Sequence, residues 1–238
     1  MRRALAFLTP IGGARAPTPS TLGWFPIVGA ALGAALGGWW WLAATRWPPM
    51  VASALVVAGD LAATGMLHFD GLLDAADGLL PHLSLARRLE VMQEPAVGAF
   101  GVGVGAAVLL VRWAALAALV ASPWLLVGIW SLSRAAMAVG AATMPYARPE
   151  GLARAFLDGA RTARAGRVAG ALGMVIGGGA LLVWHVGAGA CTAAAVVAGA
   201  LGVLLLARRR LGGFTGDVLG AAGLVGETVA LVVAAARW

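Results

Sequence analysis

The chain has few of the side chains that most often carry chemistry. Its 238 residues include no lysine, one cysteine, one tyrosine, three histidines and ten acidic residues. With a single cysteine, Cys191, the chain forms no internal disulfide and no cysteine-rich metal site. Charged residues make up only 11% of the sequence, which is far below the share typical of soluble proteins.

Apolar residues are abundant instead. They form 61% of the chain, and the mean hydropathy is +0.90, which indicates a membrane protein. We therefore predict an all-α integral membrane protein, with one membrane-embedded domain over residues 1–238 and a bundle of about seven spans. A bilayer-crossing helix needs about twenty apolar residues, and that length is found at 22–43, 49–68, 97–121, 123–144, 167–186, 189–207 and 218–236. The short turn at 185–190 leaves six spans as an alternative.

All seventeen basic residues are arginines, and their positions support seven spans. Thirteen fall in segments on one side of the predicted membrane, whereas only Arg46 and Arg237 fall on the other. Arginine-rich loops face the cytoplasm, so we predict a cytoplasmic N-terminus. Since the net charge of +7 follows the loops, it indicates topology, and we expect membrane lipid and no nucleic acid as a partner.

Three of the ten acidic residues lie in one short stretch directly after the second predicted span. Residues 64–78 read T-G-M-L-H-F-D-G-L-L-D-A-A-D-G, which includes Asp70, Asp74 and Asp77. On a helix these carboxylates would share an arc about 60° wide. Like charges at this spacing repel and destabilise the helix, so we expect a bound cation to offset them. Hard oxygen ligands suit Mg²⁺ or Mn²⁺. The alternative is a solvated acidic helix start.

A second polar motif, G-G-F-T-G-D at 212–217, precedes the last predicted span. Its glycines, including Gly213, allow backbone N–H groups to approach an anion, and a helix N-terminus favours phosphate. Thr215 and Asp217 lie in the same turn. The alternative is a flexible turn in which Asp217 is the N-cap of the helix.

Four ionisable residues lie inside predicted spans, where they are functional candidates by default: Asp60, Arg112, Arg134 and Glu227. Asp60, Arg134 and Glu227 lie at similar depths and are able to meet. An internal ion pair is the favoured reading for Asp60, whereas Arg134 and Glu227 suit either an ion pair or a substrate cavity. We expect Arg112 to extend toward the outer face.

A histidine and a loop arginine complete the candidates. His68 precedes Asp70 by two positions, so on a helix it would point about 160° away from the aspartates. His68 belongs to the same site as the aspartates only if the backbone there is not helical. The alternative is that His68 caps a helix at the membrane interface. Arg148 lies in a basic loop at 145–166, which reads either as a topological signal or as the rim of an anion site.

Taken together, the motifs closely resemble the cobalamin synthase family, the adenosylcobinamide-GDP ribazoletransferases, over nearly the whole chain. The matching segments are F-L-T at 7–9, F-P-I-V-G at 25–29, the 64–78 stretch, R-R-L-E-V-M-Q-E-P-A-V-G-A-F-G at 87–101, S-R at 133–134, M-P-Y-A-R-P-E-G at 144–151 and G-G-F-T-G-D-V-L-G at 212–220. The resemblance gives Asp60 no role.

The resemblance implies an Mg²⁺-dependent, multi-pass enzyme of the bacterial cytoplasmic (inner) membrane, with its active site facing the cytoplasm. It would join adenosylcobinamide-GDP to α-ribazole or its 5′-phosphate and release GMP. The implied partners are these corrinoid and ribazole substrates. Assembly into a homo-oligomer or with other cobalamin-assembly enzymes is also expected.

The resemblance also implies the site residues. The metal or pyrophosphate site would comprise His68, Asp70, Asp74, Asp77 and Asp217. On this basis we expect the four aspartates to hold one or two Mg²⁺ ions, and one carboxylate or His68 to accept the hydroxyl proton. Substrate binding is expected from Arg134, Arg148, Gly213, Thr215, Asp217 and Glu227.

Two other classes of protein remain alternatives. A CDP-alcohol phosphotransferase would also place aspartates and Mg²⁺ at a membrane face, but its usual D-G-x-x-A-R pattern is absent here, because Asp74 follows Gly71-Leu72-Leu73. A transporter would explain the charges inside the spans, and it predicts substrate binding near the membrane midplane without GMP release.

Overall fold

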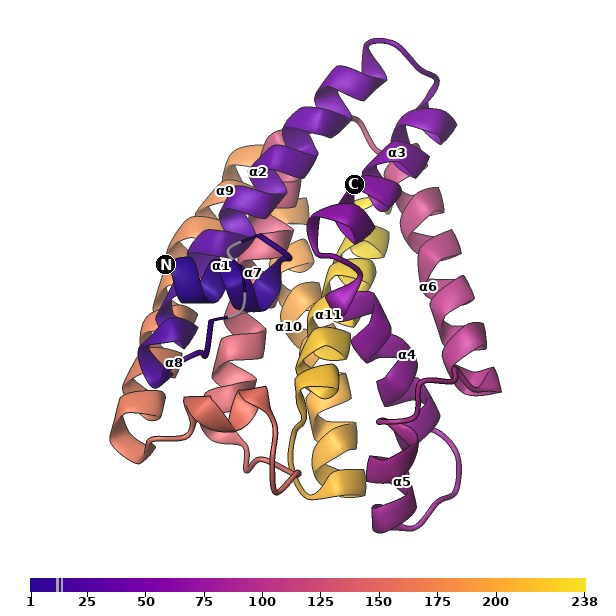
Figure 1. The fold of residues 1–238 in the computed structure, drawn as a ribbon. Coiled ribbons are helices and arrows are strands. Elements are labelled where there is room, and N and C mark those ends of the chain that lie inside the picture. The colour runs from indigo at the N-terminus through magenta and orange to yellow at the C-terminus, as the bar shows by residue number, and fades with distance from the viewer. Residues whose placement is uncertain (12, 14) are drawn as a thin grey trace.

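The computed structural model describes residues 1–11, 13 and 15–238, and these form helices joined by short loops, with no strand beyond one isolated bridge (Figure 1). In chain order the elements are α1 (Arg2–Leu8), η1 (Pro19–Trp24), α2 (Phe25–Ala44), α3 (Pro49–Ala63), α4 (Leu67–Leu79), α5 (Leu85–Val91), α6 (Ala99–Ala118), α7 (Pro123–Thr143), η2 (Leu152–Phe156), α8 (Gly159–Leu172), η3 (Gly173–Gly178), α9 (Gly179–Trp184), α10 (Val186–Leu211) and α11 (Gly216–Ala234).

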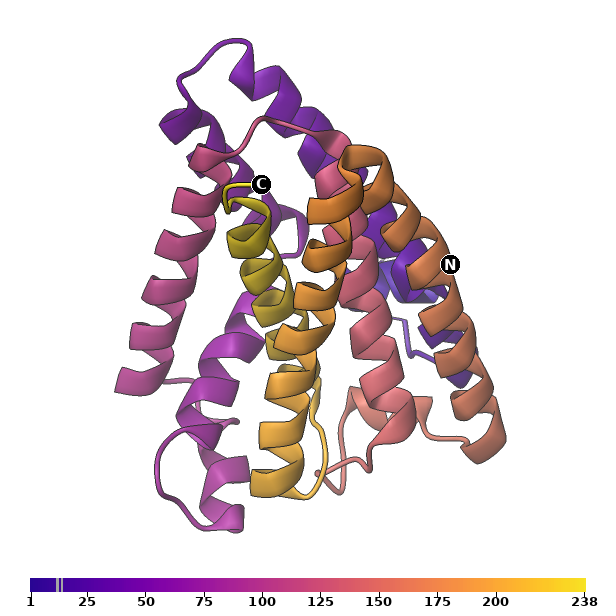
Figure 2. The ribbon, with the colours of Figure 1, turned by 180° about the vertical axis from the view of Figure 1, so that it is seen from behind.

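The predicted all-α membrane bundle is confirmed. Six helical stretches of the described chain are long and apolar enough to cross a bilayer, and a bent pair makes a seventh if it counts as one span. The six stretches are Pro19–Ala44, Ala99–Ala118, Pro123–Thr143, Gly159–Trp184, Val186–Leu211 and Gly216–Ala234. Helix α11 lies within the bundle and packs against α4, α7 and α10 (Figure 2).

The bent pair is formed by α3 and α4, where a straight span over 49–68 was predicted. The chain turns by 87° between these helices. Gly65 and Met66 both have positive φ, at 58° and 60°, a conformation that stops a right-handed helix and that glycine adopts without strain. The single straight span is therefore wrong, and the acidic stretch lies on the second helix of a broken pair.

The predicted span over 167–186 starts too late, because its helix begins at Gly159 and passes through the π-helical turn η3. The helix ends at Trp184, and His185 caps the next one by accepting a hydrogen bond at Nδ1 from the Ala188 N–H, at 3.1 Å. The two spans predicted on either side of this turn are thus separate helices.

Helices α2 and α7 approach each other closely through a row of glycines. Gly29, Gly33 and Gly37 recur every four residues and so share one face of α2. A Cβ at Gly33 would clash with the Leu126 carbonyl, and one at Gly37 would lie 2.6 Å from the Pro123 Cα. Small residues let membrane helices pack backbone against backbone, and this row fixes the position of α7.

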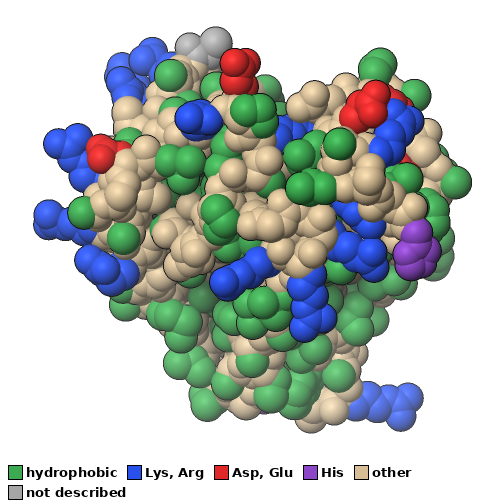
Figure 3. Space-filling model, turned by 90° about the horizontal axis from the view of Figure 1, so that it is seen from below, with side chains coloured by type: hydrophobic (Ala, Val, Ile, Leu, Met, Phe, Trp, Pro, Cys, Tyr) green, Lys and Arg blue, Asp and Glu red, His purple; other side chains and the backbone are tan. Residues whose placement is uncertain are grey.

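One end of the bundle gathers the long polar loops. They are segments 80–98, 144–158 and 211–216, and arginine side chains are spread over this face (Figure 3). We call these segments and the adjoining helix ends the arginine-rich end. The candidate carboxylates lie on the helices that reach it.

Candidate active site

Helix α4 meets the beginning of α11 at two glycines. A Cβ at Gly71 would lie 2.9 Å from the Cα and the carbonyl oxygen of Asp217, and one at Gly220 would lie 3.2 Å from the Cα of His68. The absence of side chains at these positions lets the two helices touch. As a result, the acidic stretch of α4 and the first turn of α11 form one site.

Thr215 starts α11. Its hydroxyl accepts a hydrogen bond from the Val218 N–H at 3.2 Å and donates one to Oδ2 of Asp217 at 3.2 Å. Thr215 is therefore the N-cap, and the alternative that gave this role to Asp217 is wrong. Asp217 lies in the first helical turn, where a carboxylate interacts favourably with the helix dipole.

The loop after α7 pairs with the loop before α11. The Phe214 N–H donates to the Pro145 carbonyl at 2.9 Å, and the Ala147 N–H donates to the Phe214 carbonyl at 2.9 Å. Gly213 makes this pairing possible, because a Cβ there would clash with the Pro145 carbonyl. Burial raises the pKa of the neighbouring Tyr146 above its usual value, so its phenol stays protonated at neutral pH.

This pairing directs Arg148 to the carboxylates. Its Nη2 lies 2.9 Å from Oδ2 of Asp217 and donates to the Met92 carbonyl at 3.1 Å. Its Nε is buried and has no hydrogen-bond partner among the described residues. Arg148 is thus the arginine that the structure places at the acidic site, as the basic loop suggested.

Three carboxylates act on one another at this site, and Arg148 interacts with two of them, Asp74 and Asp217. Asp70 is exposed, Asp74 and Asp217 are partly buried, and Asp74 is repelled by both of the others. Arg148 offsets part of their charge. The site therefore keeps an excess of negative oxygen donors, which is the chemistry that a hard divalent cation requires.

Asp77 lies on the same helix but has other partners. Its Oδ2 accepts a hydrogen bond from the Gly98 N–H at 2.7 Å, and its Oδ1 accepts one from the Gly101 N–H at 2.9 Å. These amides belong to the start of α6, whose first N–H groups have no partner within the helix. Asp77 therefore caps α6, a role that the sequence did not suggest.

Among the described residues, no three His, Cys, Asp or Glu side chains converge into a group able to hold a metal. Mg²⁺ is commonly bound through one or two carboxylates together with substrate phosphates and water. At most two of Asp70, Asp74 and Asp217 would serve as ligands of such an ion at once, with substrate oxygens completing its coordination. The donor set is acidic and open on one side, because Asp70 is exposed.

His68 does not join the aspartates. It lies in the first turn of α4, is 3% exposed and packs beside Gly220 of α11. Neither ring nitrogen has a hydrogen-bond partner in the part of the chain that the structure describes. The charges that act on it are those of Arg134 and Arg112. The backbone here is helical, so His68 points to the bundle interior, as helical geometry requires.

The four ionisable residues of the spans form one buried network. Nη2 of Arg112 lies 2.6 Å from Oδ2 of Asp60, and its Nη1 lies 3.1 Å from Oε2 of Glu227. Arg134 pairs with the other oxygen of Glu227. All four are at most 4% exposed. The expectation that Arg112 extends to the outer face is wrong, because two buried carboxylates hold it inside.

Uncharged side chains complete this network. The Trp130 indole donates to Oδ1 of Asp60 at 3.0 Å, and the Arg112 guanidinium stacks over the Trp130 ring, 5.2 Å from its centroid. Ser133 donates to Oε1 of Glu227 at 2.7 Å. Neither Trp130 nor the Ser133 hydroxyl was predicted from the sequence as a partner of these charges. The pairing of the four charged residues does leave a signal in the sequence, because two acids and two arginines inside spans favour mutual pairing.

Comparison with known proteins identifies the family of the chain. The profile of the family described as Cobalamin-5-phosphate synthase matches residues 1–235. The chain belongs to this family. Its members include proteins named adenosylcobinamide-GDP ribazoletransferase, and the chain is therefore an enzyme of cobalamin biosynthesis.

Relatives of the family match most of the chain. The adenosylcobinamide-GDP ribazoletransferase of Stutzerimonas stutzeri (strain A1501) is 39% identical, over 92% of this chain and 90% of its own length. The protein of the same name from Chlorobium chlorochromatii (strain CaD3) is 35% identical, over 98% and 93%. The one from Desulfitobacterium hafniense (strain Y51) is 36% identical, over 83% and 79%. No solved structure matches the chain.

Proposed function

We propose that the protein is an Mg²⁺-dependent transferase that joins adenosylcobinamide-GDP to α-ribazole or its 5′-phosphate. The products are GMP and adenosylcobalamin or its 5′-phosphate. The observation that carries this proposal is the meeting of Asp70 and Asp74 of α4 with Asp217 of α11, beside Arg148. The names of the relatives support the choice of substrates.

The reaction replaces a phosphoanhydride bond by a phosphate ester bond. The ribose hydroxyl oxygen of α-ribazole bonds to the phosphorus next to the cobinamide, and the bond from that phosphorus to the GMP oxygen breaks. Mg²⁺ bound at the site would supply positive charge for the pyrophosphate and the leaving group. A carboxylate of the site accepts the proton of the attacking hydroxyl.

The protein's own residues have separate parts in this proposal. Two of the carboxylates of Asp70, Asp74 and Asp217 would hold the cation together with phosphate oxygens of the substrate. The salt bridge with Arg148 fixes the orientation of Asp217. Arg148 also donates to phosphate oxygens, for which its buried, unpartnered Nε is available. Thr215 and Gly213 position Asp217 and the loop that carries Arg148.

Arg134 and Glu227, which were expected to bind substrate, are not part of the proposed substrate site. Both are at most 1% exposed and pair with each other inside the bundle. We assign them to the stability of the helix packing. His68 likewise lies apart from the carboxylates, so we assign the proton transfer to an aspartate.

The arginine-rich end faces the cytoplasm of a bacterial inner membrane in this proposal, as the positive-inside rule predicts. Helix α4 ends and α11 begins toward this side, and Asp217 lies in the first turn of α11. Water-soluble nucleotide substrates then have access to the site without crossing the bilayer.

The proposal is tested with purified protein in lipid nanodiscs, supplied with adenosylcobinamide-GDP. We expect GMP release that requires both α-ribazole and Mg²⁺ and that stops when a chelator is added. Release of CMP from a CDP-alcohol would favour the alternative phosphotransferase. Uptake of cobinamide into sealed vesicles without any GMP release would favour a transporter, and either result would overturn the proposal.

A further inference from the structure

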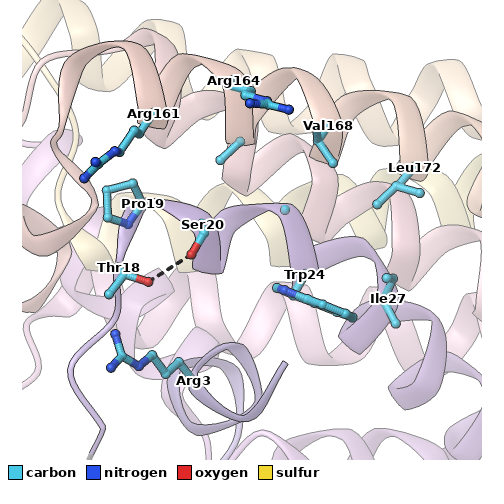
Figure 4. A pocket seen from close by; sticks show the side chains of 12 residues that line it. Arg3, Thr18, Pro19, Ser20, Trp24, Ile27, Arg161, Arg164, Val168 and Leu172 are labelled. Carbon is cyan, nitrogen blue, oxygen red and sulfur yellow. Dashed lines mark hydrogen bonds between the residues drawn. The ribbon is translucent and has the colours of Figure 1, made fainter.

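A groove of about 840 Å³ lies on the side of the bundle between η1 and α8 (Figure 4). Its walls come from α1, η1 with the residues that flank it, and α8. No residue of α4, α11 or the loop around Arg148 lines it. The groove is thus separate from the candidate active site.

The α8 wall changes from basic to apolar along its length. Arg161, Arg164, Val168 and Leu172 all line the groove, and their spacing places them on one helix face. The distance along the helix axis from Arg161 to Leu172 is about 16 Å. The arginines lie at the arginine-rich end, and the apolar side chains lie further along α8, away from that end.

The opposite wall changes in the same direction. Thr18 and Ser20 lie at the polar end of the groove, with their hydroxyl oxygens 3.2 Å apart, whereas Trp24 and Ile27 lie at the apolar end (Figure 4). Trp24 is 41% exposed and Val168, across from it, is 44% exposed. The apolar part of the groove is therefore open toward the surroundings of the bundle.

The polar end carries unbalanced positive charge. Arg161 pairs with Asp158 at 3.1 Å. Arg3 and Arg164 also line the groove, and neither has an ion-pair partner among the described residues. Two arginines and two hydroxyls thus surround a space that continues between apolar side chains.

We propose that this groove binds one anionic phospholipid. The phosphate lies between Arg3 and Arg164, within reach of the Thr18 and Ser20 hydroxyls, and an acyl chain lies between Trp24 and Val168. Charge favours an anionic headgroup, and the open apolar end favours a hydrocarbon chain over a small soluble phosphate. The site does not depend on the proposed reaction.

Native mass spectrometry of the detergent-solubilised protein tests this, with phosphatidylglycerol and phosphatidylcholine of the same acyl chains added separately. We expect one phosphatidylglycerol to bind in preference to phosphatidylcholine. The double variant Arg3→Gln/Arg164→Gln should lose that preference, by about fivefold in affinity for each charge removed. Arg164→Lys, which keeps the charge, should retain most of it.

The matched control is Arg2→Gln/Arg167→Gln, which removes two exposed arginines from the same two helices but outside the groove. It should bind phosphatidylglycerol as the unaltered protein does. Equal binding of both lipids, or equal loss in both double variants, would overturn the proposal. So would complete displacement of the lipid by millimolar inorganic phosphate, because the groove would then be a soluble-phosphate site.

Discussion

Asp74 and Asp77 lie three residues apart on α4, yet their different surroundings indicate different roles. Asp74 faces the carboxylates of Asp70 and Asp217, whereas both oxygens of Asp77 accept backbone hydrogen bonds from the start of α6. A carboxylate that caps a helix contributes to stability, and one that faces other carboxylates is available to a cation. The two residues are therefore separable by experiment.

For Asp77→Asn, we expect a loss of stability of about 1–2 kcal/mol, because the amide keeps only one acceptor oxygen for the two N–H donors. Turnover per folded molecule should change by less than about tenfold, since Asp77 has the weakest influence of the carboxylates that act on Asp74. Thermal unfolding and GMP release measured on the same preparation check both values. If Asp77→Asn is as stable as the unaltered protein but inactive, the prediction is wrong and Asp77 is a catalytic residue.

The sequence predicted the acidic helix and its neighbouring motif, because like charges on one helix face are visible in one dimension. It did not predict how each aspartate is used. The partners of Asp77 are backbone amides more than twenty positions away, and backbone groups leave no signature in a sequence. Arg112 was misjudged for a similar reason, since its depth in a span does not show which carboxylates it meets.

At the scale of helices, the buried network joins four of them. Asp60 comes from α3, Arg112 from α6, Arg134 from α7 and Glu227 from α11. Glu227 contacts both arginines, so it is the centre of the network. Such a network favours one arrangement of these helices, because any other would leave buried charges without partners.

Glu227→Gln should therefore lower stability by about 3–5 kcal/mol, since two buried arginines lose their shared carboxylate. Glu90→Gln is the matched control, because Glu90 is an exposed acid whose one ion-pair partner in the described part of the chain is Arg87. Thermal unfolding of both variants in the same detergent checks the difference. Equal unfolding temperatures would show that the network contributes little.

The glycine row of α2 is open to a similar test. Gly33→Ala should destabilise the protein by about 1–3 kcal/mol, because the added methyl group meets the α7 backbone at Leu126. Gly38→Ala, on the same helix, meets nothing within 4 Å and should be neutral or slightly stabilising. If both variants unfold alike, the α2–α7 contact is not backbone to backbone.

The helix boundaries show where the sequence is informative. Apolar length located five of the seven spans to within a few residues, since the bilayer sets that length. It placed the start of the span at 159–184 eight residues too late. The bend between α3 and α4 was missed because it depends on two residues of positive φ, and one of them is Met66. Methionine rarely adopts this conformation, so only the packing around the bend explains it.

At the scale of the whole molecule, the orientation in the membrane is the next prediction. In a Cys191→Ser background, Thr45→Cys at one end and Leu80→Cys at the arginine-rich end both introduce an exposed thiol. A membrane-impermeant maleimide added to intact cells should label position 45 and not position 80. Labelling at 80 alone would place the site outside the cytoplasm.

The central claim is that carboxylates from two helices act together on the diphosphate of the substrate. Its most direct test is GMP release from adenosylcobinamide-GDP, with α-ribazole and Mg²⁺ present, by Asp74→Asn and Asp217→Asn. Asp158→Asn is the control, an exposed acid at the same end whose one ion-pair partner among the described residues is Arg161. We predict a fall of at least about a hundredfold for the first two variants and little change for the third. Near-normal GMP release by Asp217→Asn would contradict the claim.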